Sequence, residues 1–95
     1  MIKEISDAQK KVLIKRLTEN LPTLRAKLRV SQSELADRIG VTRQTLTAIE
    51  SGKREMTWVT FVALTLLLMQ NEDTKMLLPV VNVYTDDLKK FFSFS

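Results

Sequence analysis

The sequence has no cysteine and no histidine among its 95 residues. Without cysteine, the chain can form neither a disulfide framework nor a thiolate site, and this composition suits a reducing cytoplasm. Without histidine, the commonest general base, the Ser-His-Asp triad and the usual zinc sites are excluded, so catalysis would have to rest on carboxylates or lysine alone. We therefore expect no enzyme, no catalytic residue, no bound metal and no cofactor.

Glycine and proline are also scarce, with two of each. This argues against a turn-rich all-β fold, while the abundant Leu, Lys, Arg, Ala and Glu are good helix formers. An apolar content of 44% and a charged content of 27% are typical of a folded chain of one domain. The composition predicts an all-α fold, built as a small helical bundle.

Two short helices joined by a tight turn are predicted within residues 31–54. Ser31 and Glu34 have the spacing of a capping box, in which each side chain satisfies a free backbone N–H at the start of a helix. Gly40 can end that helix, because glycine adopts the left-handed conformation without a steric penalty. Thr42 can then cap a second helix, over about residues 42–51.

The outward face of this second helix is polar but carries little charge. At about 100° per residue, Leu46 and Ile49 mark its buried side. A helix that is merely solvated usually carries a denser coat of charged side chains, so this face is better suited to contact with a ligand. Its outward residues are Gln44, Thr47, Ala48 and Ser51, with Arg43 at the edge.

These residues give a recognisable pattern. Residues 20–69 resemble the lambda-repressor/Cro (XRE-type) helix-turn-helix family through the run S-Q-x-E-L-A-x-x-x-G-V-x-x-x-T-L-x-x-I-E-x-G-K-R. In that family the second helix of the motif enters the DNA major groove while the first crosses the backbone. The resemblance implies a sequence-specific transcriptional regulator, a repressor that binds an inverted repeat of double-stranded DNA as a homodimer, in the cytoplasm at the nucleoid.

The resemblance also assigns roles to single residues. Base contacts are expected from Arg43, Gln44 and Thr47, because arginine can pair with guanine and glutamine with adenine. Phosphate contacts, which fix register without reading sequence, are expected from six further residues. These are Gln32, Thr42, Thr45, Ser51, Lys53 and Arg54.

Charge is unevenly distributed along the chain. Residues 1–19 hold five basic and three acidic residues, residues 20–69 hold seven and four, and residues 70–95 hold three and four. The positive potential therefore accompanies the motif and the segment before it, where phosphate contact is expected.

An alternative function remains open, in which the chain is an antitoxin-like or phage-type adaptor subunit. In that function its apolar C-terminal tail binds another protein and its DNA binding is autoregulatory.

Residues 1–19 are expected to form a basic amphipathic helix that is capped by Asp7 and not a signal peptide. Its lysines and Arg16 would face outward, and its inward residues would be Val12, Leu13, Ile14 and Leu17. Because Pro22 clashes with the preceding turn, we expect a break there, with Asn20 capping the next helix. The first helix then either covers one side of the bundle or touches the DNA backbone or a second subunit.

An apolar helix capped by Thr57 is expected next, and it is too short to span a bilayer. We expect Trp58 to belong to the core and the helix to be covered on two sides. Residues 70–95 are expected to form a tail and a candidate dimerisation element, with a helix over about 73–81 that is strained or ended by Pro79, then a turn near Asn82 and a last helix capped by Thr85 or Asp86. A strand at 80–84 competes with this reading. The tail aromatics Phe91, Phe92 and Phe94 are expected to dock on the chain's own core or across a subunit interface.

Overall fold

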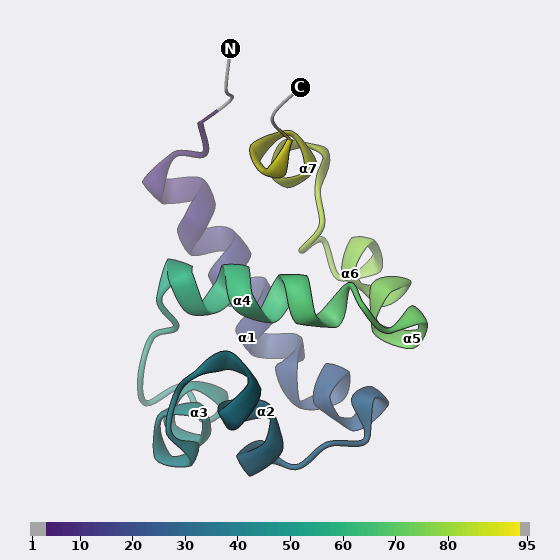
Figure 1. Cartoon of the computed structure of the whole chain (residues 1–95). Helices are drawn as coiled ribbons and strands as arrows, with labels where there is room; N and C mark the ends of the chain where they lie inside the picture. The colour runs from purple at the N-terminus through teal and green to yellow at the C-terminus, as the bar shows by residue number, and fades with distance from the viewer. Residues whose placement is uncertain (1–3, 94–95) are drawn as a thin grey trace.

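The structure is a computed structural model that describes residues 4–93. Over that range it contains helices only, which confirms the all-α prediction; the competing strand at 80–84 does not form, and Asn82 instead turns the chain with a φ of 60°. Figure 1 shows the arrangement of the helices. They are α1 (Asp7–Leu28), α2 (Gln32–Ile39), α3 (Arg43–Glu50), α4 (Trp58–Leu68), α5 (Glu72–Lys75), α6 (Leu77–Val80) and α7 (Asp86–Phe92).

The long helix α1 corrects the predicted break near Pro22. It runs without interruption from Asp7 to Leu28, and its cap is Ser6, in a capping box with Gln9, rather than Asp7. Asn20 does not cap a second helix, because its Nδ2 donates to the carbonyl of Arg16 at 2.7 Å inside α1.

The reason for the unbroken helix is tertiary. Pro22 lies on the exposed side of α1, so the one helical hydrogen bond that proline removes is lost on the side that faces water. On the opposite side, Leu17, Leu21 and Leu24 are completely buried. Their continuous apolar row holds both halves of the helix against the same core, and this burial outweighs the local cost of the proline.

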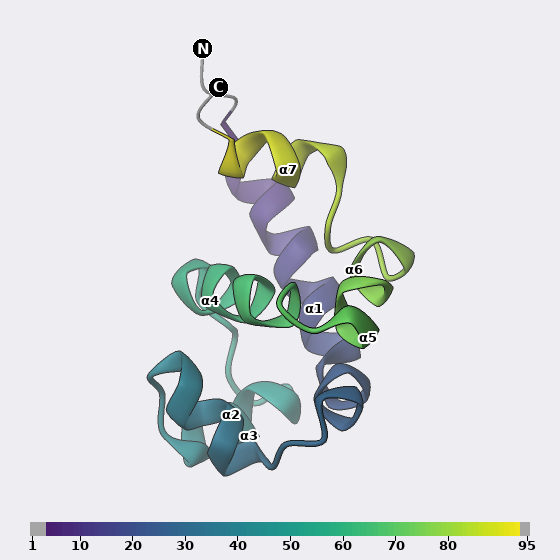
Figure 2. The same ribbon diagram turned by 45° about the vertical axis from the view of Figure 1, so that its right-hand side comes forward.

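The helix α1 is the element around which the others pack. It contacts α3, α4 and α5, and α4 crosses it in both views of the ribbon (Figures 1 and 2). The fully buried side chains from the other helices include Leu35, Leu46 and Phe61. The core is therefore one continuous cluster that fixes the helix-turn-helix against α1.

The C-terminal helix α7 returns to the N-terminal half of α1. Thr85 caps it, as one of the two predicted alternatives had it, and Leu88 is completely buried. Phe91 and Phe92 are half-buried against the core, with the Phe91 ring edge-on to Trp58 at a centroid distance of 5.7 Å. These two aromatics therefore dock on the chain's own core, whereas Phe94 lies outside the described residues.

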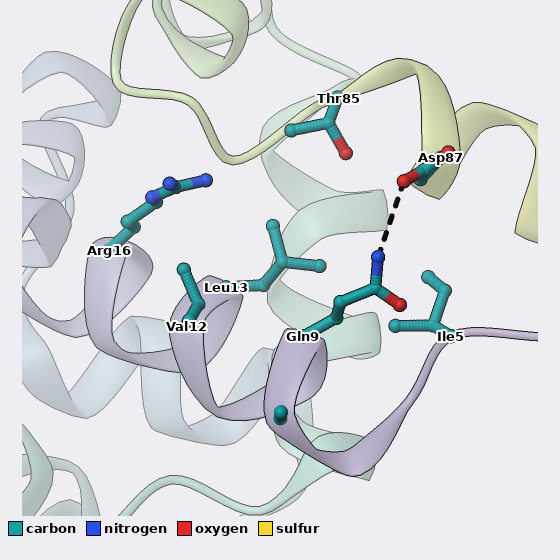
Figure 3. A pocket seen from close by; sticks show the side chains of 8 residues that line it. Ile5, Gln9, Val12, Leu13, Arg16, Thr85 and Asp87 are labelled. Carbon is teal, nitrogen blue, oxygen red and sulfur yellow. Dashed lines mark hydrogen bonds between the residues drawn. The ribbon is translucent and has the colours of Figure 1, made fainter.

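A groove of about 310 Å³ separates α1 from the start of α7 (Figure 3). Gln9 Nε2 donates to Asp87 Oδ2 across it at 3.4 Å, and Arg16 Nη1 donates to the carbonyl of Asn82 at 3.0 Å. Val12 lines this groove and is 46% exposed, so its predicted inward position was wrong. These bonds attach the tail to α1 at a distance from the helix-turn-helix.

Candidate nucleic-acid interface

Three local features set the start of α2 and the turn that joins it to α3. Ser31 and Glu34 form the predicted capping box at the start of α2. Gly40 ends the helix with a φ of 78°, a left-handed conformation that costs glycine little. The hydroxyl of Thr42 then accepts the backbone N–H of Thr45 at 3.1 Å and begins α3. These residues were predicted from sequence, because each acts within four positions of its partner.

The end of α3 brings two basic residues beside it. Gly52 turns the chain with a φ of 79°, and the backbone N–H groups of both Lys53 and Arg54 then donate to the carbonyl of Ala48. Both side chains are exposed. The local backbone therefore holds positive charge directly after the helix, where the chain leaves the exposed face of α3.

A polar network ties α3 to α1 and α2. Arg25 forms a bidentate ion pair with Glu50, in which Nε donates to Oε2 at 3.0 Å and Nη2 donates to Oε1 at 3.2 Å. Gln32 Nε2 also donates to Glu50 at 3.1 Å, and Thr47 Oγ1 donates to Gln32 Oε1 at 2.9 Å. Glu50 is 7% exposed in its side chain, so its charge is satisfied by partners rather than by water.

Sequence reasoning missed this network. Glu50 stands inside the quoted motif, but its partners are 25 and 18 positions away, on two other helices. Helical periodicity shows which side of a helix is inward and cannot show which side chain meets it. A basic residue near the end of α1 is the only local signal, and it does not single out Arg25.

The outer face of α3 forms one side of a shallow groove of about 450 Å³. Arg43, Gln44 and Thr47 are exposed there, so the three predicted base contacts lie on one surface. Within residues 4–93, the side chains of Arg43 and Gln44 make no hydrogen bond or ion pair, and neither does Lys53. Their donors and acceptors are thus available to a ligand. The groove is lined by Arg43, Gln44, Thr47, Ala48, Ser51 and Lys53.

The residues predicted to contact phosphate differ in whether their side chains are already hydrogen-bonded within the protein. Thr42 and Thr45 share a hydrogen bond between their hydroxyls at 2.9 Å, and Arg54 Nη1 donates to the Thr45 hydroxyl at 3.4 Å. Ser51 Oγ donates to the carbonyl of Ala48 at 3.1 Å. Gln32 is half-buried, with its amide used by the network around Glu50. Of these predicted contacts, Lys53 and Arg54 present the most accessible charge.

Neither a metal-binding cluster nor a membrane-spanning helix is present in the described part of the chain. No group of three or more acidic side chains there is placed to hold a metal ion. No helix between residues 4 and 93 combines the length and the apolar character that crossing a membrane requires.

The fold and this surface define a helix-turn-helix whose second helix presents a hydrogen-bonding face that carries little charge and lies beside basic residues. Residues 23–57 match the family model described as Helix-turn-helix. The matched segment contains α2 and α3, and it is similar to the helix-turn-helix of the lambda-repressor/Cro (XRE-type) DNA-binding regulators, as the sequence pattern predicts. Comparison with curated proteins and with solved structures gave no match.

Proposed function

We propose that the protein is a sequence-specific transcriptional repressor that binds an inverted-repeat operator as a homodimer in the cytoplasm, without enzymatic activity. The observation that carries this proposal is the exposed face of α3. It presents Arg43 and Gln44, whose side chains hydrogen-bond to nothing else in residues 4–93, with the basic Lys53 beside them. Such a face is suited to the edges of bases in the major groove, which display donors and acceptors in a different pattern for each base pair.

The base readers in this proposal are Gln44, Arg43 and Thr47. Gln44 can pair through two bonds with adenine, and Arg43 can do the same with guanine, each worth roughly 1 to 3 kcal/mol of discrimination. The hydroxyl of Thr47 already donates to Gln32, which leaves its methyl group to contact a thymine methyl. The network around Glu50 supports this role, since it keeps α3 at a fixed angle to α2.

The phosphate contacts in this proposal act in two ways. Lys53 and Arg54 contribute charge directly, and the exposed Thr42 and Ser51 hydroxyls can donate to a phosphate oxygen in place of their bonds to Thr45 and to the carbonyl of Ala48. Gln32 and Thr45 are bound internally, so they would contribute while also positioning Thr47 and Arg54. None of these contacts reads sequence, and they fix the register in which α3 meets the groove.

A homodimer is part of the proposal because one helix reads only a few base pairs. Two copies related by a two-fold axis would bind half-sites about 34 to 36 Å apart, or a multiple of that spacing. An operator with inverted symmetry follows directly from the symmetry of such a pair.

The experiment that tests this function is selection of the purified full chain against random duplex DNA at near-physiological salt, followed by sequencing of the retained DNA. The proposal predicts enrichment of an inverted repeat. Binding that shows no enriched sequence and vanishes as salt rises would be electrostatic only, and it would contradict the proposal. A protein-binding role for the tail is not proposed as a second function, because Phe91 and Phe92 pack against the chain's own core.

A further inference from the structure

The outer face of α4 is apolar and uncovered. Val59 is 78% exposed and Leu66 is 48% exposed, and Val62 and Ala63 lie between them, half-buried. At 100° per residue, these four positions fall within an arc of about 100° and form one stripe two turns long. We call the stripe formed by Val59, Val62, Ala63 and Leu66 the α4 stripe. Water contact with it is unfavourable, so it is suited to cover by another apolar surface.

The stripe carries no charge that could select a charged partner. From Trp58 to Leu68, α4 contains no Asp, Glu, Lys or Arg. The whole chain has a net charge of +4, so two copies approaching through their basic surfaces would repel one another. Two copies approaching through α4 would meet at a neutral face.

The other exposed apolar residues offer less. Val12 lines the groove beside α7. Met76 and Val80 are 68% and 72% exposed, but they are the N-cap and the last residue of α6, which is only four residues long. A helix of one turn is too short to pair along its length with another helix, whereas the α4 stripe extends over two turns.

We propose that the α4 stripe pairs with the α4 stripe of a second copy of this chain, with the two helices antiparallel. This rests on the proposed function, in which an inverted repeat requires a two-fold axis, and it names the surface through which the axis passes. An axis between residues 62 and 63 sets Val59 against Leu66 of the partner subunit. The same axis sets Val62 against Ala63 of the partner subunit.

The stripe is complementary to itself in this register. Each larger side chain meets a smaller one, so Leu66 is opposite valine and Val62 is opposite alanine at the centre. The small Ala63 allows the two helix axes to approach closely where they cross. A different protein would have to supply the same pattern by chance, whereas a second copy supplies it through symmetry.

The pairing is expected to be reversible. Stable interfaces of standard size bury roughly 800 Å² on each partner, and one stripe on a helix about 16 Å long offers less than that. The dimer should therefore dissociate on dilution. An operator that holds two copies side by side should favour formation of the dimer. This would make occupancy of the operator depend steeply on protein concentration.

Engineered disulfides test the register, since the chain has no cysteine of its own. The variants are Val59→Cys, Leu66→Cys and the double variant that carries both. In the proposed pairing, Val59 lies beside Leu66 of the partner subunit. The two copies of Val59 are about 10 Å apart along the direction of the paired helices, which is too far for a disulfide. Positions 59 and 66 of the same helix are equally far apart, so the double variant cannot form this disulfide within one chain.

On mild oxidation, the double variant should move from 10.9 kDa to twice that mass, while both single variants stay at 10.9 kDa. Equal cross-linking of the single variants, as a parallel pairing or random collision would give, overturns the proposal. So does the absence of cross-linking in all three, as expected if a different protein covers the stripe.

Sedimentation equilibrium provides a test without cysteine. Leu66→Asp should raise the dimer dissociation constant at least about tenfold, because a charge would be buried in an apolar contact. Val80→Asp, a matched change at an exposed valine outside the stripe, should leave it unchanged, and circular dichroism should show both variants folded. An unchanged dissociation constant for Leu66→Asp overturns the inference.

These results are separable from those for DNA binding. Enrichment of an inverted repeat by a protein whose dimer does not depend on the α4 stripe removes this inference and leaves the proposed function standing. Register-specific cross-linking by a protein that enriches no DNA sequence removes the proposed function and leaves the interface standing.

Discussion

The helices α3 and α4 begin in the same way and differ in what they present to their surroundings. Each is capped by a threonine, Thr42 or Thr57, whose hydroxyl accepts the backbone N–H three residues later. In each, the cap also bonds to the hydroxyl of a second threonine, at 2.9 Å in α3 and 3.0 Å in α4. Equivalent local chemistry therefore starts two helices whose exposed faces have different uses.

The difference lies in the side chains beyond the cap. Both exposed faces are poor in charge, but α3 offers hydrogen-bonding groups such as Gln44, while α4 offers valine and leucine. Hydrogen-bonding groups can distinguish one base pair from another, whereas an apolar face gains free energy mainly by leaving water. A low charge density thus indicates a contact surface, and the kind of side chain indicates what it contacts.

The inner sides differ as well. The inner side of α4 is held by apolar side chains, including Phe61 and Leu64, which are fully buried. The inner side of α3 combines buried Leu46 and Ile49 with the ion pair between Arg25 and Glu50. Changes on these inner sides should affect folding, and changes on the outer faces should affect binding.

The largest expected effect is that of Phe61→Ala, which should lower the free energy of unfolding by about 3 to 5 kcal/mol through lost burial and the cavity left behind. Val59→Ala, two positions away on the exposed face, should change it by less than about 0.5 kcal/mol. Urea denaturation followed by circular dichroism measures both. Similar losses for the two variants would show that α4 does not have distinct inner and outer faces.

A smaller effect is expected where α3 is anchored. Glu50→Ala should lower the free energy of unfolding by about 2 kcal/mol, since it leaves Arg25 without its partner in a partly buried position. The matched control is Glu19→Ala, which breaks the exposed pair with Lys15 at 4.0 Å and should cost less than about 0.5 kcal/mol. The same denaturation measurement applies. If Glu50→Ala were as mild as the control, the ion pair would not be what anchors α3.

The smallest effects concern two buried threonines, which should respond with opposite signs. Thr65 in α4 is completely buried and its hydroxyl has no hydrogen-bond partner within residues 4–93, so Thr65→Val should stabilise the fold by about 1 kcal/mol. Thr74 is equally buried, but its hydroxyl donates to the carbonyl of Leu68, so Thr74→Val should destabilise it by about 1 kcal/mol. Thermal unfolding would show melting temperatures shifted in opposite directions. Shifts of the same sign would contradict the difference in hydrogen bonding.

The parts of the fold that the sequence predicts correctly are local. The caps Ser31, Thr42 and Thr57 and the glycine turn at Gly40 were all predicted, because each is defined by residues a few positions apart. The proposed base readers lie on one exposed surface, and this was also predictable because the rotation of about 100° per residue along a helix puts them on the same side.

The parts that could not be predicted depend on packing between distant segments. Pro22 suggests a break, and only the burial of Leu17 and Leu24 against the rest of the molecule shows why none occurs. The helix α4 is apolar nearly all round, so its sequence indicates that it needs cover without showing which side stays open. The exposure of Val59 and the pairing of Arg25 with Glu50 are known only from the assembled fold.

The central claim is that the outer face of α3 reads sequence while the residues after it supply charge. The most direct test compares the affinity of Gln44→Ala for the selected operator and for a scrambled duplex at the same salt concentration, with Lys53→Ala as the control. We expect Gln44→Ala to lose roughly 1 to 3 kcal/mol of discrimination between the two DNAs. Lys53→Ala should weaken both alike and reduce the salt slope by about one. Equal losses on operator and scrambled DNA for Gln44→Ala would contradict the claim.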